Sequence, residues 1–268
     1  MTVQNPQASA RYTAIGEWLA TEGRVDVVDI ANRLGVAQET IRRDLRTMES
    51  AGKLQRVHGG AVRVDAGPLA LRNSQTSDDD ELELSRRIWA QLPRRGTVLL
   101  GTGGLALALA HAIVTEPPDE SGLTVVTNSL DAAVVLSRAS RLEVYNIGGT
   151  VSPITRAQEG DWAVHEMGRL HVDVSVVCPA GISVERGLTQ STPAAAAVSQ
   201  VEVACGERVI ALAGPTTFGV TSFVQFAQLD QIDLIAIAGR PDPATRQPFE
   251  ERGVAITVAE DPIVEEGL

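Results

Sequence analysis

Charged side chains gather on one side of a helix that is predicted around residue 45. These residues are Glu39, Arg42, Arg43 and Arg46. Because each residue of an α-helix is rotated by about 100° from the one before, the four side chains fall within an arc roughly 100° wide. The stripe beside them is apolar and consists of Ile41, Leu45 and Met48. A guanidinium group can donate two parallel hydrogen bonds to a guanine or pair with a phosphate. The pattern therefore predicts a helix that packs on its own protein through one stripe and enters a DNA major groove with the next.

Polar residues at the start of this helix and in the segment after it extend the predicted contact surface. Glu39 can accept a hydrogen bond from a cytosine amino group, or it can oppose the helix dipole and pair with Arg43. Arg56 and His58 can follow the DNA backbone or the minor groove. The full predicted DNA-binding set is Gln38, Glu39, Thr40, Arg42, Arg43, Arg46, Lys53, Arg56 and His58. The alternative is a charged, solvent-exposed helix without a role in DNA binding.

The elements that must position this helix are indicated by caps and turns. In chain order they are a helix over 8–22 that buries Tyr12, Ile15, Trp18 and Leu19, a helix over 27–34 after the N-cap Asp26, a helix over 38–50, and strands over 53–57 and 61–64. Gly35 allows a sharp turn between the second and third helices. Gly59 and Gly60 tolerate positive φ in the turn between the strands. This order predicts an α+β winged helix-turn-helix domain over residues 8–64.

Length and composition predict two domains and no membrane segment. The chain has 268 residues, of which 44% are hydrophobic and 3% aromatic, so its core must consist mainly of aliphatic side chains. No run approaches the roughly 20 apolar residues that cross a bilayer, and the N-terminal residues do not form a signal peptide. Cys178 and Cys205 lack a metal or redox spacing, so we expect reduced thiols in a cytoplasmic protein. We expect no cofactor and no metal, since His58 has no partner at ligand spacing.

The net charge of −11 is unevenly distributed. Residues 11–65 hold nine basic and eight acidic side chains, a net charge of +1, so the remainder carries −12. Within residues 39–63, six basic groups outnumber three acidic ones. Because phosphates repel an acidic body, we expect DNA to bind only at this local basic part.

From about residue 85, apolar strand-like runs alternate with helical ones. The predicted strands are 98–100, 123–127, 142–147, 172–178, 208–213, 234–238 and 255–258. The predicted helices between them are 105–114, 130–139, 161–170 and 193–204. Strands that are apolar on both faces are typical of a mostly parallel sheet covered by helices. We expect this α/β domain over residues 85–260, joined to the first domain by a linker over 65–84.

Small and polar residues follow several of these strands, at the edge where ligands of such sheets bind. The sequence Gly-Thr-Gly-Gly at 101–104 lets backbone N–H groups approach an anion at the start of a helix, and an ordinary tight turn would have the same sequence. The sequence Thr-Asn-Ser at 127–129 offers hydroxyl and amide groups to a ligand, or caps the next helix. Residues 148–149 and 185–189 can close the site or form plain turns.

Two motifs near the N-terminus resemble a known family. TIRRDL at 40–45 and VHGGA at 57–61 are similar to the N-terminal domain of DeoR-family bacterial transcriptional regulators. The resemblance implies that the helix over 38–50 is the recognition helix, and the residues it assigns to that role are Thr40, Ile41, Arg42, Arg43, Asp44 and Leu45. Among them, Ile41 and Leu45 are expected to pack rather than to read bases.

The second half of the chain resembles the sensor domain of the same family. The matching segments are LLGTGGLALALA at 99–110, VVTNS at 125–129, IGGT at 147–150, GIS at 181–183 with RGLT at 186–189, and FG at 218–219. The resemblance implies the fold of sugar-phosphate isomerases and CoA-transferases, used for sensing rather than catalysis. The predicted effector-binding residues are Gly101, Thr102, Gly103, Gly104, Thr127, Asn128, Ser129, Gly148, Gly149, Gly181, Glu185, Thr217, Phe218 and Gly219.

This chain departs from the family pattern in three loops. The departures are Leu99-Leu100 where an acidic residue usually precedes the first loop, Ala180 in place of an aspartate, and Gly-Pro-Thr-Thr at 214–217 in place of Asp-Ser-Ser-Lys. The sole lysine of the chain is Lys53. Carboxylates for sugar hydroxyls and a lysine for phosphate are therefore missing, and Arg156 or Arg186 would have to replace the lysine. An altered effector, weaker sensing and the absence of an effector all stay open.

Three functions are compatible with the sequence. The favoured one is a DNA-binding repressor of a carbohydrate catabolism operon, which a phosphorylated sugar releases from its double-stranded operator. The second keeps DNA binding but uses the α/β domain mainly for oligomerisation or for an altered effector. The third, remote one is an isomerase-like enzyme with a DNA-binding domain, in which Glu185 is the obvious candidate base. Because single recognition helices bind weakly, we expect a homo-dimer or a higher homo-oligomer without a membrane partner.

Overall fold

The computed structural model describes residues 6–22, 24–50, 54–57, 59–62 and 78–259. The chain divides into two units, Met1–Arg72 and Asn73–Leu268. The predicted linker over 65–84 is too long at its C-terminal end, because helix α5 (Asp78–Gln91) begins within it. The acidic run in the first turn of α5 resembles a linker in the sequence. The later turns of this helix bury Leu84, Ile88 and Trp89.

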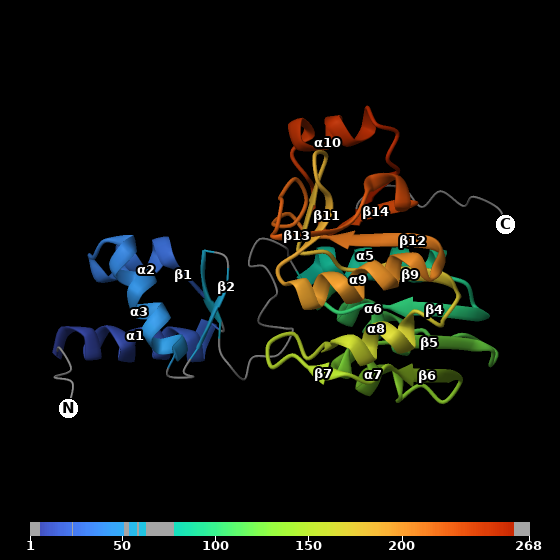
Figure 1. Ribbon diagram of the computed structural model, residues 1–268, viewed down its shortest axis with the longest axis horizontal. Helices are drawn as coiled ribbons and strands as arrows, with labels where there is room; N and C mark the ends of the chain where they lie inside the picture. Colours follow the sequence, from blue (N-terminus) through green and yellow to red (C-terminus); the bar gives the residue numbers. More distant parts are fainter. Residues whose placement is uncertain (1–5, 23, 51–53, 58, 63–77, 260–268) are drawn as a thin grey trace. The chain divides into compact units, whose positions relative to one another are not determined.

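The described part of the first unit is a winged helix-turn-helix (Figure 1). Its elements are α1 (Pro6–Glu22), β1 (Arg24–Asp26), α2 (Val27–Leu34), α3 (Gln38–Ser50), β2 (Gln55–Val57) and β3 (Gly60–Val62). The strands form an antiparallel sheet in the order β1-β3-β2. The three helices and the two wing strands are confirmed, whereas β1, only three residues long, was not predicted.

Local signals in the sequence account for the helix-turn-helix. The carboxylate of Asp26 accepts a hydrogen bond from Val28 N at 2.8 Å and caps α2, as predicted. Gly35 has φ 64° and ends α2 in the left-handed conformation, which favours glycine. The helices and strands then bury one apolar cluster, whose larger members include Ile15, Leu19, Ile30, Ile41, Leu45 and Leu54.

The two glycines of the wing have different roles. Gly59 has φ 80° and forms the turn, and its carbonyl accepts a hydrogen bond from Val27 N at 2.7 Å. Gly60 lies in β3 opposite Asp26 of β1, where a Cβ would collide with the carbonyl oxygen of Val25. The prediction that both glycines serve the turn is therefore wrong for Gly60, which is needed for the close approach of β1 and β3.

The second unit contains a seven-stranded, fully parallel sheet. Its order is β15-β14-β12-β9-β4-β5-β6. The strands are β4 (Gly96–Leu100), β5 (Leu123–Thr127), β6 (Leu142–Asn146), β9 (Val172–Val177), β12 (Gly206–Ala213), β14 (Leu234–Ile237) and β15 (Ile256–Val258). All seven predicted strands and the predicted parallel α/β architecture are confirmed. Most residues of the inner strands β4, β5, β9, β12 and β14 are buried, which gives the continuous apolar runs seen in the sequence, whereas the edge strand β6 is largely exposed.

Helices cover both faces of this sheet. Leu99 of β4 packs in one cluster with α8 (Asp161–Met167) and α9 (Pro193–Ala204). Its neighbours Val98 and Leu100 point to the other face and pack with α5, α6 (Gly104–Thr115) and α7 (Leu130–Leu136). Consequently α6 and α9, which both approach the loop after β4, do so from opposite faces of the sheet.

Several short elements were not predicted. They are the hairpin of β7 (Thr150–Val151) and β8 (Gln158–Glu159), the small sheet of β10 (Gly181–Ser183), β11 (Gly187–Gln190) and β13 (Val224–Ala227), the 3-10 helix η1 (Leu229–Gln231), and α10 (Pro243–Glu250). Strands of two to four residues contain too few alternations to be recognised from periodicity. Among the described helices, none combines the length and the apolar character needed to cross a membrane.

Candidate functional site

Helix α3 is held in place by its buried side. Ile41, Leu45 and Met48 are buried in the core of the first unit, as predicted. Asp44 is 4% exposed, and its carboxylate accepts hydrogen bonds from Arg11 Nε at 2.7 Å and Arg11 Nη2 at 3.1 Å. The resemblance implies a recognition role for Asp44. The structure corrects this, because Asp44 uses both carboxylate oxygens to fasten α3 to α1.

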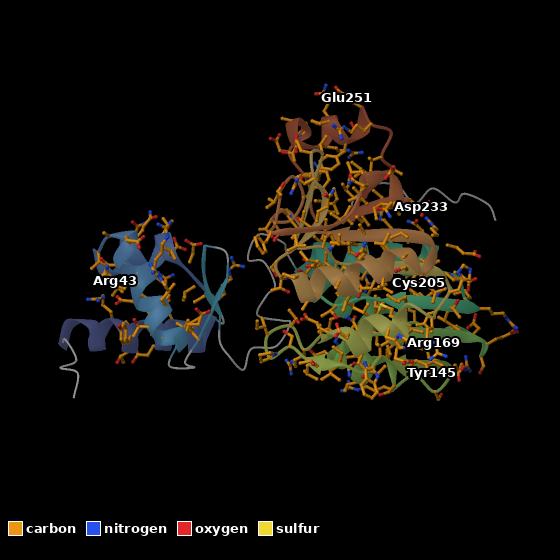
Figure 2. The ribbon with its side chains drawn as sticks, in the orientation of Figure 1. Arg43, Tyr145, Arg169, Cys205, Asp233 and Glu251 are labelled. Atoms are coloured by element: carbon orange, nitrogen blue, oxygen red, sulfur yellow. The ribbon has the colours of Figure 1, made fainter. Side chains whose placement is uncertain are left out.

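The exposed arc of α3 carries the predicted DNA-contacting charges. Arg42, Arg43 and Arg46 are exposed, and Figure 2 labels Arg43 on this helix. Glu39 pairs with Arg42 at 3.5 Å and with Arg46 at 3.0 Å. The alternative that pairs Glu39 with Arg43 is therefore wrong. Among the described residues Arg43 has no ion-pair partner, and its guanidinium group is available for a base or a phosphate.

The other predicted DNA-binding residues flank this arc. Gln38 is exposed and Thr40 is half-buried at the start of α3. Arg56 is the central residue of β2 and lies opposite Ala61 of β3. Lys53 and His58 lie outside the described residues. The structure thus brings the arginines and polar residues of α3 together, and it adds a basic residue on the wing.

The Gly-Thr-Gly-Gly loop joins β4 to α6 at the carboxyl edge of the parallel sheet. Gly103 has φ 153°, and a Cβ there would lie 3.0 Å from Cys178 Cβ. Gly103 is also the N-cap of α6 and, having no side chain, makes no cap hydrogen bond. The N–H of Ala106 donates to the thiol of Cys178, which leaves the N–H groups of Gly104 and Leu105 for an anion among the described residues.

Asn128 connects this loop to the neighbouring hairpin. Its side chain, in a residue 3% exposed, accepts a hydrogen bond from Thr102 Oγ1 at 3.0 Å and donates one to Gln158 O at 3.3 Å. Gln158 N in turn donates to Asn128 O at 2.7 Å. Gln158 is 8% exposed, and its Oε1 has no hydrogen-bond partner among the described residues. An unpaired buried acceptor beside a predicted site suits a ligand hydroxyl. Sequence reasoning missed Gln158, because the hairpin that positions it was not predicted.

Thr127 and Ser129 serve the backbone around Asn128. The hydroxyl of Ser129 accepts a hydrogen bond from Ala132 N at 3.3 Å and caps α7. Thr127 Oγ1 accepts one from Ser129 N at 3.0 Å. The capping alternative is thus confirmed for Ser129, and Asn128 is the member of this triplet whose side chain contacts the loop.

The segment after β6 adds a cation. Gly149 packs so closely on β8 that a Cβ would lie 2.7 Å from Glu159 O, and a Cβ on Gly148 would lie 3.6 Å from Trp162 Nε1. Further along, Arg156 adopts φ 52°, an unusual conformation for a residue with a side chain. Its Nε lies 3.2 Å from Asp131 Oδ2 without hydrogen-bond geometry. Arg156 is therefore a loosely paired cation two residues from the Gln158 that binds Asn128.

The last segment of the predicted site, 217–219, is structural. The hydroxyl of Thr217 closes a turn by bonding to the N–H and the carbonyl of Gly214. Phe218 is buried and stacks on Phe249 with ring centroids 4.5 Å apart. Gly219 has φ 76° and packs against Thr245. Phe218 therefore packs in the core instead of facing a ligand.

The β10–β11 hairpin separates the two remaining predicted residues. Gly181 lies at its base, paired with Thr189. Glu185 is exposed in its turn, beside Val184, whose carbonyl accepts a hydrogen bond from Arg252 at 2.7 Å. The hairpin therefore carries Glu185 away from its base, and the predicted contribution of Glu185 to the effector site is not supported by its position.

One candidate residue was missed because it comes from a distant helix. Glu202 on α9 is 2% exposed, and a Cβ on Gly101 would lie 3.3 Å from each of its carboxylate oxygens. Burial raises the pKa of Glu202 to about 7, against a hydrogen bond from Ser199 that lowers it. Gln190 Nε2 donates to Ser199 Oγ at 3.0 Å. The sequence signal that could have identified Glu202 is its position between two valines in an alanine-rich helix.

The two cysteines beside Glu202 are free thiols. Burial raises the pKa of Cys178 to about 12 and that of Cys205 to about 11, and the charge of Glu202 adds to both shifts. Both thiols therefore stay protonated and unreactive at neutral pH. Within the described ranges, no group of three or more His, Cys, Asp or Glu residues could hold a metal ion.

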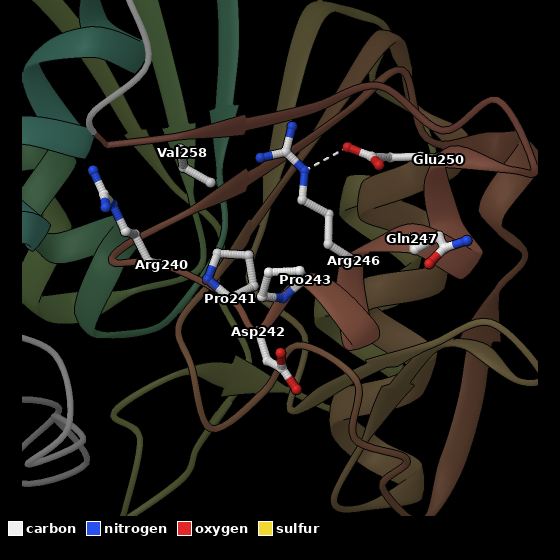
Figure 3. A pocket seen from close by; sticks show the side chains of 8 residues that line it. All are labelled: Arg240, Pro241, Asp242, Pro243, Arg246, Gln247, Glu250 and Val258. Carbon is white, nitrogen blue, oxygen red and sulfur yellow. Dashed lines mark hydrogen bonds and ion pairs between the residues drawn. The ribbon is translucent and has the colours of Figure 1, made fainter.

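A separate open groove of about 960 Å³ lies beside α10 (Figure 3). Its lining residues are Arg240, Pro241, Asp242, Pro243, Arg246, Gln247, Glu250 and Val258. None of them belongs to the predicted effector site. Asp242 caps α10, and Arg246 Nε donates to Glu250 at 2.6 Å. Because these polar groups serve each other, the groove offers a sugar fewer converging partners than the strand ends do.

A winged helix with arginines on its exposed face, followed by a parallel α/β unit with polar strand ends, defines a DNA-binding regulator with a ligand-sensing domain. Residues 11–66 match the DeoR-like helix-turn-helix domain, and residues 82–237 match the DeoR C terminal sensor domain. The chain belongs to the DeoR family of transcriptional regulators and is a DNA-binding regulator, not an enzyme.

Relatives match along nearly the whole chain. The HTH-type transcriptional regulator GlpR of Haloferax volcanii is 30% identical over 88% of this chain and 91% of its own length. The HTH-type transcriptional repressor GlcR of Bacillus subtilis is 28% identical over 93% and 96%. The L-fucose operon activator of Haemophilus influenzae is 26% identical over 92% and 98%. Among solved structures, ribose 5 phosphate isomerase A from Neisseria gonorrhoeae matches with a TM-score of 0.38 and 12% identity, over 55% of this chain and 56% of that one.

Proposed function

We propose that this regulator represses a carbohydrate catabolism operon and leaves its operator when a phosphorylated sugar binds the sensor domain. Relatives from B. subtilis and Agrobacterium fabrum are named repressors, whereas the H. influenzae relative is named an activator. The observation that carries the proposal is the start of α6, where the N-cap Gly103 makes no side-chain cap hydrogen bond and the loop is tied through Thr102 to Asn128. This arrangement places backbone N–H groups that can bind an anion beside side chains that can hydrogen-bond to hydroxyl groups.

The effector chemistry follows from the groups near this loop. The N–H groups at the start of α6 would bind the phosphate. Arg156 would supply the positive charge that the missing lysine cannot, and its loose pair with Asp131 lets it reorient. The free acceptor Gln158 Oε1 would receive a sugar hydroxyl. The proposed ligand is thus a small polyhydroxylated monophosphate.

The switch requires the effector to bind the DNA-incompetent arrangement better than the competent one. A hundredfold preference corresponds to about 2.7 kcal/mol of coupling free energy, a typical value for such regulators. The proposed phosphate site can supply this difference only if the two arrangements place the α6 loop or Arg156 differently.

The proposal is tested in two steps. Genome-wide footprinting of the bound DNA should identify an operator next to carbohydrate catabolism genes. Gel-shift titration with that operator should then show release by the sugar phosphates of the same pathway. Arg156→Gln should raise the sugar-phosphate concentration needed for release about tenfold, without changing operator affinity in its absence. Operators beside unrelated genes, or release that is equally efficient for Arg156→Gln, would contradict the proposed effector site.

A second candidate is a regulator whose sensor domain mainly oligomerises, or recognises an altered effector. The specific observation in its favour is that the only lysine lies at position 53, so the sensor domain contains none. Thermal unfolding with a panel of sugar phosphates separates the two candidates. A ligand at about 100 times its Kd should add about 2.7 kcal/mol to the free energy of unfolding. Unchanged unfolding with every sugar phosphate would favour the second candidate.

A further inference from the structure

The proposed effector chemistry leaves one buried acid without a role. The carboxyl group of Glu202 lies under Gly101, with both oxygens 3.3 Å from the position of an added Cβ. The backbone of the loop therefore lies directly over it, and the side chain of Cys178 lies beside the same loop, 3.0 Å from a Cβ added to Gly103. Glu202 reaches this position from α9, on the opposite face of the sheet from α6.

Among the residues that the structure describes, the surroundings of Glu202 supply a hydrogen bond but no buried counter-charge. Ser199 donates to the carboxylate and is itself bound by Gln190. The titratable groups on elements packed against α9, and at their ends, are Cys178, Cys205, Glu159, Asp161, His165, Glu166, His171, Asp173, Arg186, Glu207 and Arg208. The two thiols are neutral because their pKa values are about 12 and 11.

The remaining groups of this set do not neutralise Glu202. Burial raises the pKa of Glu159, which adds negative charge when it ionises. The exposed members are Asp161, His165, His171, Asp173, Arg186 and Glu207, while Glu166 is half-buried. Arg208 donates to Gln91 of α5, on the other face of the sheet. An ionised Glu202 is therefore an uncompensated buried charge next to the loop.

We propose that Glu202 determines the specificity of the sensor domain, because the loop at 101–104 accepts an anionic group only when Glu202 carries a proton. This inference rests on the proposed function, since it concerns the same anion-binding loop. Two negative charges separated by a backbone layer repel each other strongly where water does not screen them. Binding of an anion therefore takes up a proton, and the affinity falls as the pH rises.

The pH window follows from the shift in pKa. Burial raises the pKa of Glu202 from 4.5 to about 7, so the folded chain keeps this proton where the unfolded chain has lost it. The free energy of unfolding that depends on Glu202 consequently falls as the pH rises from about 4.5 to 7. An anion bound at the loop favours the protonated form and moves the upper limit of this window to higher pH.

The test uses sulfate as the anion, because its charge is constant between about pH 6 and pH 8.5. The apparent Kd of sulfate is obtained from its effect on thermal unfolding of the full chain at each pH. The wild-type chain should bind sulfate about tenfold more weakly at the upper end of this range than at the lower end. Glu202→Gln cannot ionise and should bind sulfate equally at both. Glu251→Gln, at the exposed C-cap of α10, should behave like the wild type.

Ser199→Ala provides an independent variant. It removes the hydrogen bond that lowers the pKa of Glu202, so the loss of sulfate binding should move to higher pH. This shift carries the test if Glu202→Gln fails to fold, and an unchanged midpoint in Ser199→Ala would then overturn the inference.

The possible results distinguish this inference from the proposed function. Sulfate binding that is independent of pH in the wild type, or equally pH-dependent in Glu202→Gln, overturns the role of Glu202 and leaves the anion-binding loop intact. Sulfate that stabilises neither protein at any pH overturns the loop as an anion site, and the role of Glu202 with it.

Discussion

Arg43 differs from the other two arginines of α3, because Glu39 binds those two and Arg43 has no ion-pair partner within the described part of the chain. We therefore expect Arg43→Ala to remove a direct contact with DNA and to weaken operator binding by about 10- to 100-fold, which corresponds to roughly 1–3 kcal/mol. The fold should be unaffected, because the side chain is exposed. A gel-shift titration at constant salt measures the change.

The matched control is Arg33→Ala on α2. Arg33 is also an exposed arginine of the first unit, but its guanidinium group lies over the ring of Trp18 at 5.1 Å. Its loss should change operator affinity less than the loss of Arg43. An equal loss in both variants would indicate that only the total charge of the domain matters.

Asp44 has the opposite role on the same helix. Asp44→Ala should leave Arg11, itself largely buried, without its partner and lower the free energy of unfolding of the first unit by about 3 kcal/mol. Circular dichroism during thermal unfolding measures this loss. Glu39→Ala removes an exposed acid from the same helix and should cost less than about 1 kcal/mol.

The double variant Arg11→Ala/Asp44→Ala adds a second check. It removes both charges, so it should recover part of the stability lost in Asp44→Ala. The single variant Arg11→Ala completes the comparison. If the double variant lost as much stability as the two single variants together, the coupling between α1 and α3 that the hydrogen bonds imply would be refuted.

At the scale of elements, the turn from β4 into α6 depends on Gly103. Its φ of 153° and its contact with Cys178 exclude a side chain. Gly103→Leu should therefore distort the start of α6 and abolish release by the effector while sparing operator binding. Ala197→Leu adds the same side chain at an exposed position of α9 and should keep normal release. Gel shifts with and without the effector measure both, and full release of Gly103→Leu would exclude an anion site at this loop.

The sequence reveals long elements because periodicity and caps act locally. Asp26, Gly35 and the apolar stripe of α3 indicate the helix-turn-helix without any tertiary information. The inner strands of the parallel sheet are likewise recognisable from runs that are apolar on both faces, and the edge strand β6 from its alternating apolar residues. Strand β1 and the β7–β8 hairpin were missed, because two or three residues form a strand only when a partner strand is present.

The candidate effector site is predictable only in part. The loop at 101–104 and Asn128 follow predicted strands, and the structure joins them through Thr102. Glu202 lies 101 positions after Gly101 in the sequence, so their contact depends on how α9 packs on the sheet. The opposite error concerns Glu185, which was assigned to the site because it lies between two matching segments, although it is in the turn of a hairpin.

At the scale of the whole molecule, the charge distribution limits how the chain binds DNA. The first unit has a small positive charge, and the rest of the chain is strongly acidic. The net charge of the whole chain is −11. One such recognition helix provides few contacts, so we expect a homo-dimer or larger homo-oligomer to bind half-sites separated by multiples of about 10 base pairs. Light scattering after size-exclusion chromatography and footprinting of the operator measure the assembly and the spacing.

Salt dependence provides a further measure of this arrangement. Since we expect only a few arginines to contact phosphates, the slope of log affinity against log salt should be modest for each protomer. It should decrease by about one when a phosphate-binding arginine is removed. A monomer that binds a single half-site with full affinity would contradict the expected assembly.

The contact between Gly60 and the carbonyl of Val25 has a genetic consequence. Every amino acid other than glycine carries a Cβ, so any missense change in codon 60 pushes the wing away from β1, and even alanine is too large. A screen for mutants that have lost control of the regulated genes should therefore recover many different substitutions at this position. Codons for exposed residues such as Asn32 should contribute few.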